Sequence, residues 1–484
     1  FIKALSVVVS SPIAVINIYY LLGFGLVAAS SHLVMRALGV HLPVAVVLSL
    51  TFALLPWHFH RVGHLLLANY VSVCAATLAV WALARRDRWW NSGTRVSSLR
   101  MTALILCLIL VGTSGLYYFA FFLGAALVAI SVRLLGQSSL REVVLRFLLL
   151  SVSVLAFGLS WLATMIPRST EALEPVVVRS PEDSLTYGGY LYTLVRPSDY
   201  LSSALARFVP RLDSFMAVTV PGEGNADFNI ATVAAALFSL FVVLRLTMAG
   251  RRTRPFWGSH SVWPGLYLLA VGVFAIGSVG FVVAQVISPN IRAWGRFSVY
   301  VAFFALIMLG LFLSHWRRNG RRGPVWLAVI LLAIPLAVDI GSHHYRLNTD
   351  LGAANQVEQS RYVAHAEARL DPGCPVLQLP VVAFPEMPPV QKMPDYTHLW
   401  PYIYSSQLRW SYGAMKNTTA AEWQSRLPQD VPGILAEARR AGFCGIHLDQ
   451  DGYADDTVER ELNELLGEPI VMSSSGRWQL FEID

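Results

Sequence analysis

Long apolar runs alternate with short arginine-bearing segments over the first 342 residues, and this alternation restricts the chain to few folds. A membrane-spanning helix needs about 20 mostly apolar residues, because the hydrocarbon layer offers no partners for free backbone groups. Hydrophobic residues make up 55% of the sequence and charged residues only 14%, unlike a soluble domain. The sequence therefore predicts a polytopic α-helical membrane protein.

About ten spans are expected. They lie near 11–36, 42–57, 65–84, 101–114, 116–135, 143–166, 229–249, 263–287, 297–315 and 325–342. Only Gly112-Thr113-Ser114-Gly115 separates the fourth span from the fifth. Because such small and turn-forming residues interrupt helices, we expect these two spans to form a hairpin that turns at the interface.

Four arginine clusters predict the orientation of the spans. All four fall on one side of a ten-span arrangement, and the positive-inside tendency makes that side cytoplasmic. The clusters are Arg85, Arg86, Arg88, Arg95 and Arg100; Arg133 and Arg141; Arg251, Arg252 and Arg254; and Arg317, Arg318, Arg321 and Arg322. The loops at 58–64, 167–228 and 288–296 are then extracytoplasmic. The first span also begins outside, so we expect an earlier span or a signal segment before Phe1.

The C-terminal part differs in charge from the rest of the chain. Residues 343–484 hold 19 Asp and Glu against 11 Lys and Arg, whereas the remainder holds 11 acidic and 26 basic residues. Basic segments between apolar helices indicate membrane orientation, so we exclude nucleic-acid binding as their role. We expect a membrane domain at 1–342, including an outer loop at 167–228, and a soluble extracytoplasmic α/β domain at 343–484.

Local patterns in the C-terminal part are typical of a small α/β domain. Strands are expected at 375–379 and 445–448, helices at 431–441 and 455–466, and a closing hairpin of 470–473 with 478–481. Cys374 and Cys444 each lie at the start of an expected strand, so adjacent parallel strands would bring them together. A disulfide and two unrelated buried thiols remain open. Cys74 and Cys107 lie in spans and are expected to be buried small hydrophobes.

The sequence contains no Walker loop, dinucleotide fingerprint, HExxH or CxxC motif, so we look for chemistry at the outer membrane surface. The first candidate is the segment at 56–64, with His58, His60, Arg61 and His64. In a continuous helix, His60 and His64 would lie one turn apart on one face, suited to a phosphate or a sugar hydroxyl. The alternatives are an interfacial belt of aromatic and histidine side chains, or a metal site that lacks a third ligand.

The second candidate is the arginine pair in the loop at 288–296. Arg292 and Arg296 are four residues apart, expected on one turn of the helix that enters the next span, on a side where positive charge is otherwise scarce. Guanidinium groups form bidentate hydrogen bonds with phosphates, and a helix N-terminus adds a favourable dipole. We therefore expect the pair to bind a lipid-linked phosphate or diphosphate. The alternative is contact with ordinary phospholipid headgroups.

The loop at 167–228 mixes carboxylates with tyrosines, as sugar-binding surfaces do. Its acidic residues include Glu171, Glu174, Glu182, Asp183, Asp199, Asp213, Glu223 and Asp227. Most of them are expected to be solvated. Asp227 is a weak candidate for a general base, because it lies where the loop re-enters the bilayer. Tyr117 and Tyr118 are expected to belong to an aromatic belt.

Several of these runs resemble bacterial inner-membrane proteins of the GT-C glycosyltransferase type, in particular the sugar translocase or phosphoglycerol-transferase-like family. The resemblance lies at 17–24, 56–61 with 63–65, 115–118, 291–296, 384–386, 408–416 and 441–446. It implies a polyprenyl-phosphate-linked sugar donor, bound at the outer leaflet, and a glycan, lipid or protein acceptor. In that family the general base lies in the first outer loop, which would precede Phe1 here, so no catalytic acid is carried over.

The expected mechanism is an inverting transfer. A carboxylate at the outer face would deprotonate the acceptor hydroxyl while Arg292 and Arg296 stabilise the departing lipid phosphate, with the His58 to His64 cluster as second choice. No metal ion is required if two arginines take that role. A lipid-linked sugar flippase and a non-catalytic envelope-assembly scaffold are the alternatives. The flippase is disfavoured because the ionisable residues near span positions, Arg245 and Asp339, lie close to span ends.

Overall fold

The computed structural model describes residues 2–9, 11–61, 63–85, 95–135, 139–165, 179–198, 204, 207–208, 210–220, 222–248, 256–257, 260, 262–341 and 349–483. Contacts between Cα atoms divide the chain into two compact units. The membrane unit comprises Phe1–Ile166 and Arg179–Tyr345, and the C-terminal unit contains Arg346–Asp484. Each unit is described separately below.

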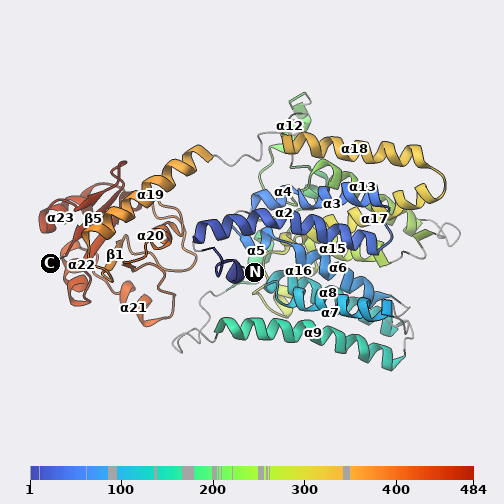
Figure 1. Cartoon of the computed structure of the whole chain (residues 1–484), viewed down its shortest axis with the longest axis horizontal. Helices are drawn as coiled ribbons and strands as arrows, with labels where there is room; N and C mark the ends of the chain where they lie inside the picture. Colours follow the sequence, from blue (N-terminus) through green and yellow to red (C-terminus); the bar gives the residue numbers. More distant parts are fainter. Residues whose placement is uncertain are drawn as a thin grey trace. The chain divides into compact units, whose positions relative to one another are not determined.

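The membrane unit is a bundle of apolar helices (Figure 1). Its main helices are α2 Pro12–Ala37, α3 Leu42–Ala53, α6 Val71–Ala84, α7 Arg95–Gly112, α8 Leu116–Leu135, α9 Leu140–Met165, α13 Ile230–Met248, α15 Val262–Phe274, α17 Ser298–Arg318 and α18 Arg322–Gly341. Short elements connect them: α1 Ile2–Leu5, α4 Pro56–His60, α5 Leu65–Ala68, α10 Asp183–Thr186, η1 Leu191–Val195, α12 Pro210–Met216, α16 Val279–Val286 and η3 Trp294–Phe297.

The helices confirm the predicted polytopic helical fold. Among the described residues, seven helices are long and apolar enough to cross a membrane, with α3 and α4 taken together as Leu42–His60 and η3 with α17 as Trp294–Arg318. Three shorter apolar helices, Val71–Ala84, Ser97–Gly112 and Val262–Phe274, coincide with the other predicted spans. Each expected span therefore contains an apolar helix, although three of these helices are short.

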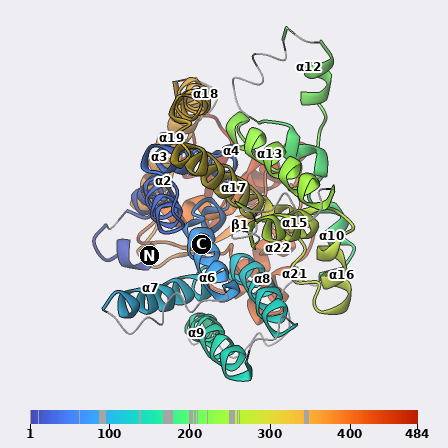
Figure 2. The same cartoon turned by 90° about the vertical axis from the view of Figure 1, so that its right-hand side faces the viewer.

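Helix α17 is the centre of the bundle, as the view along the helices shows (Figure 2). Of the 18-residue apolar stretch in its span, 89% is buried inside the protein, against 22% in α2 and 28% in both α9 and α18. Close packing on α17 needs small residues, and a Cβ at Gly310 would lie 3.0 Å from the Leu48 side chain. Apolar side chains exposed on α2, α9 and α18 suit a lipid environment.

Two of the expected spans are each divided into two helices. The 65–84 span consists of α5 and α6, which are separated at Asn69-Tyr70. The freed Leu67 carbonyl accepts hydrogen bonds from Trp57 Nε1 at 3.2 Å and Tyr118 Oη at 2.8 Å. Such partners make a helix break tolerable at membrane depth. The 263–287 span is likewise divided into α15 and α16.

Arginines of the first and fourth expected clusters lie at one end of the membrane unit, here called the basic end, where Arg318 and Arg85 both act on His260. Arg251, Arg252 and Arg254 lie outside the described residues. Burial together with the charges of Arg317, Arg36 and Arg318 lowers the pKa of His41, which lies between α2 and α3. Arg146 of α9 donates to the carbonyls of Leu83 and Arg85 at the end of α6. The described arginines of the first and fourth clusters thus lie at the same end, as expected.

The C-terminal unit is a five-stranded sheet with helices on both faces (Figure 1). Its strands are β1 Pro375–Leu379, β2 Arg409–Trp410, β3 Gly445–Asp449, β4 Val471–Met472 and β5 Trp478–Glu482, in the order β2-β1-β3-β5-β4. β1 is parallel to β2 and β3, whereas β5 is antiparallel to β3 and β4. The sequence prediction of two parallel strands and a closing hairpin is confirmed.

Side chains along each strand point alternately to the two faces of the sheet, and each face has its own hydrophobic core. Helices α19 Thr349–Arg369 and α20 Trp400–Tyr404 pack on one face with Val376 and Leu480. Helices α22 Val431–Arg440 and α23 Thr457–Leu466 pack on the other face with Leu377 and Ile446. The remaining elements are η4 Thr397–Leu399, α21 Thr419–Ser425 and η5 Gln450–Gly452. A disulfide joins Cys374 and Cys444, which precede β1 and β3 and have Cα atoms 5.9 Å apart.

The C-terminal unit contains a fully buried histidine. His447 in β3 is 0% exposed, and its Nδ1 lies 2.7 Å from Tyr362 Oη. Burial lowers the pKa of His447 well below its ordinary value, and the charges of His398 and Arg477 act in the same direction. The unfolded chain therefore binds a proton that the folded one excludes once the pH falls below about 6.5.

We expect the C-terminal unit to lose stability below pH 6.5, by about 1.4 kcal/mol per pH unit for one such group. The measurement is hydrogen exchange of the Gly445–Asp449 strand in the full-length protein at pH 7.5 and pH 5.5, corrected for the intrinsic exchange rate. Protection should be lower at pH 5.5. Equal protection at both pH values would mean that His447 is accessible to protons in the folded state.

Candidate functional site

Five segments meet at the end of the membrane unit opposite the basic end. They are the α4–α5 connection, the described parts of the 179–198 and 222–228 loops, the segment that enters α17, and the start of α8. The polar end is defined here by eight residues: His60, Arg61, His64, Asp183, Glu223, Asp227, Arg292 and Arg296. The structure thus brings together all three loops that the sequence grouped on one side.

Glu223 lies between two arginines. Arg296 donates to both carboxylate oxygens, from Nε at 2.8 Å and from Nη2 at 2.5 Å. Arg61 Nη1 lies 3.5 Å from the same carboxylate. The three side chains are only 10–15% exposed. Burial acts to raise the pKa of Glu223, but the hydrogen bond and charge of Arg296, with Arg61 and His64, bring it below its ordinary value.

Aromatic rings support both arginines. The Arg61 guanidinium lies 4.1 Å from the centroid of a Trp57 ring, and that of Arg296 lies 4.2 Å from the Tyr117 ring. Such stacking orients a guanidinium and adds cation–π attraction. Two positive charges face one carboxylate in this cluster, so one positive charge is in excess.

A glycine permits the close approach of the Glu223 backbone to η3. A Cβ at Gly295 would lie 2.3 Å from the Glu223 carbonyl oxygen. The Gly295 N–H donates to the Tyr187 carbonyl at 2.9 Å, and Tyr190 N donates to Gly224 O at 3.0 Å. Backbone hydrogen bonds of the 187–190 segment therefore position the residues next to both Glu223 and Arg296.

Arg292 does not share a helical turn with Arg296, in contrast to the sequence expectation. Only Trp294–Phe297 is helical there, as a 3-10 turn, and Arg292 precedes it. Arg292 Nη1 lies 3.2 Å from Asp183 Oδ2, and its guanidinium lies 4.5 Å from the Tyr187 ring. The two arginines reach the polar end from one loop, but each has its own carboxylate.

The expectation of one helical histidine face at 56–64 is also wrong, because α4 ends at His60 and α5 begins at Leu65. His58 points into the packed interior with 0% exposure, and its ring stacks on Phe24 at 3.6 Å between centroids. Its Nε2 lies 3.3 Å from the Tyr20 carbonyl oxygen. His58 is therefore separated from the other candidate side chains of this segment.

His60 and Asp227 form a pair that the sequence did not predict. His60 Nδ1 lies 3.0 Å from Asp227 Oδ1, although the residues are 167 positions apart. Asn225 Nδ2 also donates to Asp227 Oδ1, at 2.9 Å. Asp227 is 4% exposed, and its φ of 53° lies in the left-handed region that Asp tolerates better than most residues.

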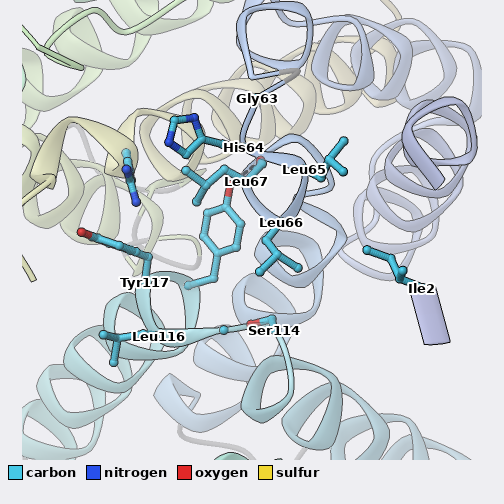
Figure 3. A pocket seen from close by; sticks show the side chains of 12 residues that line it. Ile2, Gly63, His64, Leu65, Leu66, Leu67, Ser114, Leu116 and Tyr117 are labelled. Carbon is cyan, nitrogen blue, oxygen red and sulfur yellow. Dashed lines mark hydrogen bonds between the residues drawn. The ribbon is translucent and has the colours of Figure 1, made fainter. Parts of the chain in front are cut away.

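A cavity of about 440 Å³ opens beside His64 and Arg296. Figure 3 shows His64 and Tyr117 on one side and Leu65, Leu66 and Ile2 on the other. Burial lowers the pKa of His64, and Arg296 and Arg61 act in the same direction against the opposing effect of Glu223. The cavity thus combines a cationic end with an apolar wall.

A second cavity, of about 640 Å³, shares Ile2, Leu66 and Ser114 with the first. It is lined by both apolar and polar side chains, the latter including Tyr19, Asn69, Ser72, Thr113 and Ser160. Sequence reasoning missed this lining and the roles of Glu223 and Asp183 as arginine partners. Among the described residues, no group of three or more His, Cys, Asp or Glu could hold a metal ion.

Comparison with known proteins identifies no family. No family model matches the sequence, and no curated protein matches it. Among solved structures, the chain is similar to ArnT from Cupriavidus metallidurans in the apo state, with 14% identity and a TM-score of 0.40. The match covers 96% of this chain and 83% of that chain. A likeness of this size does not assign the chain to a family.

Proposed function

We propose that the protein is a membrane glycosyltransferase. In this proposal it transfers a sugar from a polyprenyl-phosphate-linked donor to a glycan, lipid or protein acceptor of the cell envelope. The single observation that carries the proposal is the first cavity, in which Arg296 and His64 lie beside a wall of leucines at one end of the apolar helices. An amphiphile with an anionic head and an apolar tail suits such a lining.

The excess positive charge supports binding of a phosphate. Arg61 and Arg296 share the single carboxylate of Glu223, whereas Arg292 and Asp183 form a separate pair. When the bond from the sugar to phosphate breaks, negative charge develops on the leaving oxygen. Guanidinium groups that are already oriented stabilise that charge without having to reorganise.

The resemblance in sequence to GT-C proteins supports the same reaction class and suggests the placement. We propose that the polar end and a C-terminal domain at 343–484 lie on the extracytoplasmic side of a bacterial inner membrane. The donor would then lie in the outer leaflet. The partners in this proposal are the bilayer, the lipid-linked donor and the acceptor.

The test is the release of lipid phosphate by purified protein from a polyprenyl-phosphate sugar in the presence of an acceptor. We expect the variant with both Arg292→Ala and Arg296→Ala to lose on the order of 100-fold or more in rate, as when oxyanion-stabilising donors are removed. A matched control replaces Arg317 and Arg318 at the basic end by alanine. This control should keep the wild-type rate.

The same assay separates the alternatives. Full activity in the Arg292 and Arg296 double variant would contradict the site assignment. Movement of labelled lipid across vesicles without release of lipid phosphate would indicate a flippase. Arg296→Lys keeps the charge but loses the bidentate geometry, so an intermediate rate in that variant would connect the loss of activity to the phosphate contact rather than to misfolding.

A further inference from the structure

We propose that His60 is the general base of the transfer and that Asp227 is the positioning residue that holds its imidazole ring. This inference rests on the proposed function, because it names the group that activates the acceptor hydroxyl. It differs from the sequence expectation, in which a carboxylate takes the proton directly. The observation behind it is the hydrogen bond of 3.0 Å between His60 Nδ1 and Asp227 Oδ1.

Hydrogen bonds and burial position the carboxylate of Asp227. Its oxygen Oδ1 accepts from Asn225 Nδ2 at 2.9 Å as well as facing His60. Asn225 in turn contacts Arg196, whose Nη2 lies 3.4 Å from Asn225 Oδ1. Asp227 and Arg196 are buried, at 4% and 6% exposure. A buried carboxylate fixed in this way determines the orientation of the histidine ring.

The hydrogen bond also determines which ring nitrogen can take a proton. When Nδ1 carries the hydrogen that is donated to Asp227, Nε2 has the free lone pair of the neutral ring. The His60 side chain is 43% exposed, and among the described residues Asp227 is its one hydrogen-bond partner. Nε2 is therefore available to a hydroxyl group that reaches the polar end. The same division of roles operates in Ser-His-Asp enzymes.

The base lies next to the groups proposed to bind phosphate. His60 directly precedes Arg61 on the chain, and Asp227 follows Glu223 by four residues. His60 thus lies on the same segment as Arg61, and Asp227 lies on the same loop as Glu223. Among the described residues, the charged groups that act on the His60 ring are Asp227 from the 222–228 loop and Arg61 from its own segment. The carboxylate stabilises the imidazolium that forms when the ring takes a proton, whereas Arg61 opposes it.

The chemical step is balanced. His60 Nε2 takes the proton of the acceptor hydroxyl, and the acceptor oxygen forms a bond with the anomeric carbon of the sugar. The bond from that carbon to the phosphate oxygen breaks, and its electron pair leaves with the lipid phosphate. The imidazolium later releases its proton to water. No oxidant, metal ion or further reactant takes part.

The test is chemical rescue in the lipid-phosphate release assay. His60→Ala should lower kcat by 100-fold or more, within the range that general bases contribute, and leave the KM for the donor unchanged. Added imidazole should restore part of the rate in His60→Ala. His64→Ala, the matched histidine beside the cavity, should raise the donor KM and show no rescue. His365→Ala in α19 is the control with wild-type kinetics.

Asp227→Asn tests the positioning role. Asn tolerates the left-handed backbone at this position, so the fold should be kept. We expect kcat to fall without a change in the donor KM, because the carboxylate no longer fixes the tautomer that leaves Nε2 free. Asp227→Asn and His60→Ala combined should be no slower than His60→Ala alone, since one residue acts through the other.

The outcomes distinguish the base from the wider proposal. Wild-type kcat in His60→Ala, together with loss of activity in the Arg292 and Arg296 double variant, would overturn the base and leave the transferase. Loss of activity in His60→Ala without imidazole rescue, together with a raised donor KM, would assign His60 to binding and also overturn it. Absence of lipid-phosphate release by the wild-type protein would contradict both.

Discussion

Glu223→Ala is expected to destabilise the membrane unit by about 3 kcal/mol, because it leaves two buried arginines without their shared carboxylate. Loss of one partner from a buried ion pair costs about 3–5 kcal/mol. The lower end applies here, since Arg61 and Arg296 retain 10% and 13% exposure and can be partly hydrated. The two guanidinium groups would also repel each other once the carboxylate is removed.

Thermal unfolding of the purified protein in detergent measures this effect. Asp183→Ala is the matched control, because it removes the carboxylate of the neighbouring Arg292 pair. That pair is 22% and 32% exposed, so its loss should cost no more than about 1 kcal/mol. Inorganic phosphate should raise the Tm of Glu223→Ala more than that of the wild type, because an anion can replace the missing carboxylate. Equal Tm values for the two alanine variants would contradict the shared ion pair.

The positions of the spans could be predicted because the bilayer acts on each segment separately. A run such as 299–313 is apolar over its whole length, and that property alone makes it helical in lipid. The breaks within spans could not be predicted. The α5–α6 break is tolerated because Trp57 and Tyr118 donate to the Leu67 carbonyl, and Tyr118 belongs to a different helix.

The candidate site could likewise be predicted only in part. The sequence indicated some of its residues, since His60, Arg61 and Arg296 are unusual at a span end. Their partners were not, because Glu223 is one of eight acidic residues in the 167–228 loop and is 73 positions from Arg296. Pairing between distant segments depends on the tertiary packing of the loop, for example on the glycine that lets η3 approach Glu223. Helical spacing was the wrong guide at 56–64 because the helix ends there.

Replacing both Cys374 and Cys444 by alanine is expected to destabilise the C-terminal unit by about 4 kcal/mol. The disulfide closes a loop with a sequence separation of 70 residues, and a cross-link over such a loop restricts the unfolded chain strongly. The disulfide also joins the starts of two adjacent parallel strands, which the pairing of β1 with β3 already holds side by side. Its removal should therefore change the folded backbone little. The loss should therefore act mainly through the unfolded state.

Pulse proteolysis in urea of the full-length protein, with and without a reducing agent, measures this loss. The wild-type C-terminal unit should become cleavable at a lower urea concentration when reduced, whereas the Cys374 and Cys444 double variant should not respond. The variant with Cys74→Ala and Cys107→Ala is the matched control, because those thiols are unpaired and it should respond as the wild type does. A stable disulfide forms in an oxidising compartment. Protein isolated from cells with blocked thiols should therefore carry the disulfide if the C-terminal unit is extracytoplasmic, and reduced Cys374 and Cys444 would contradict that placement.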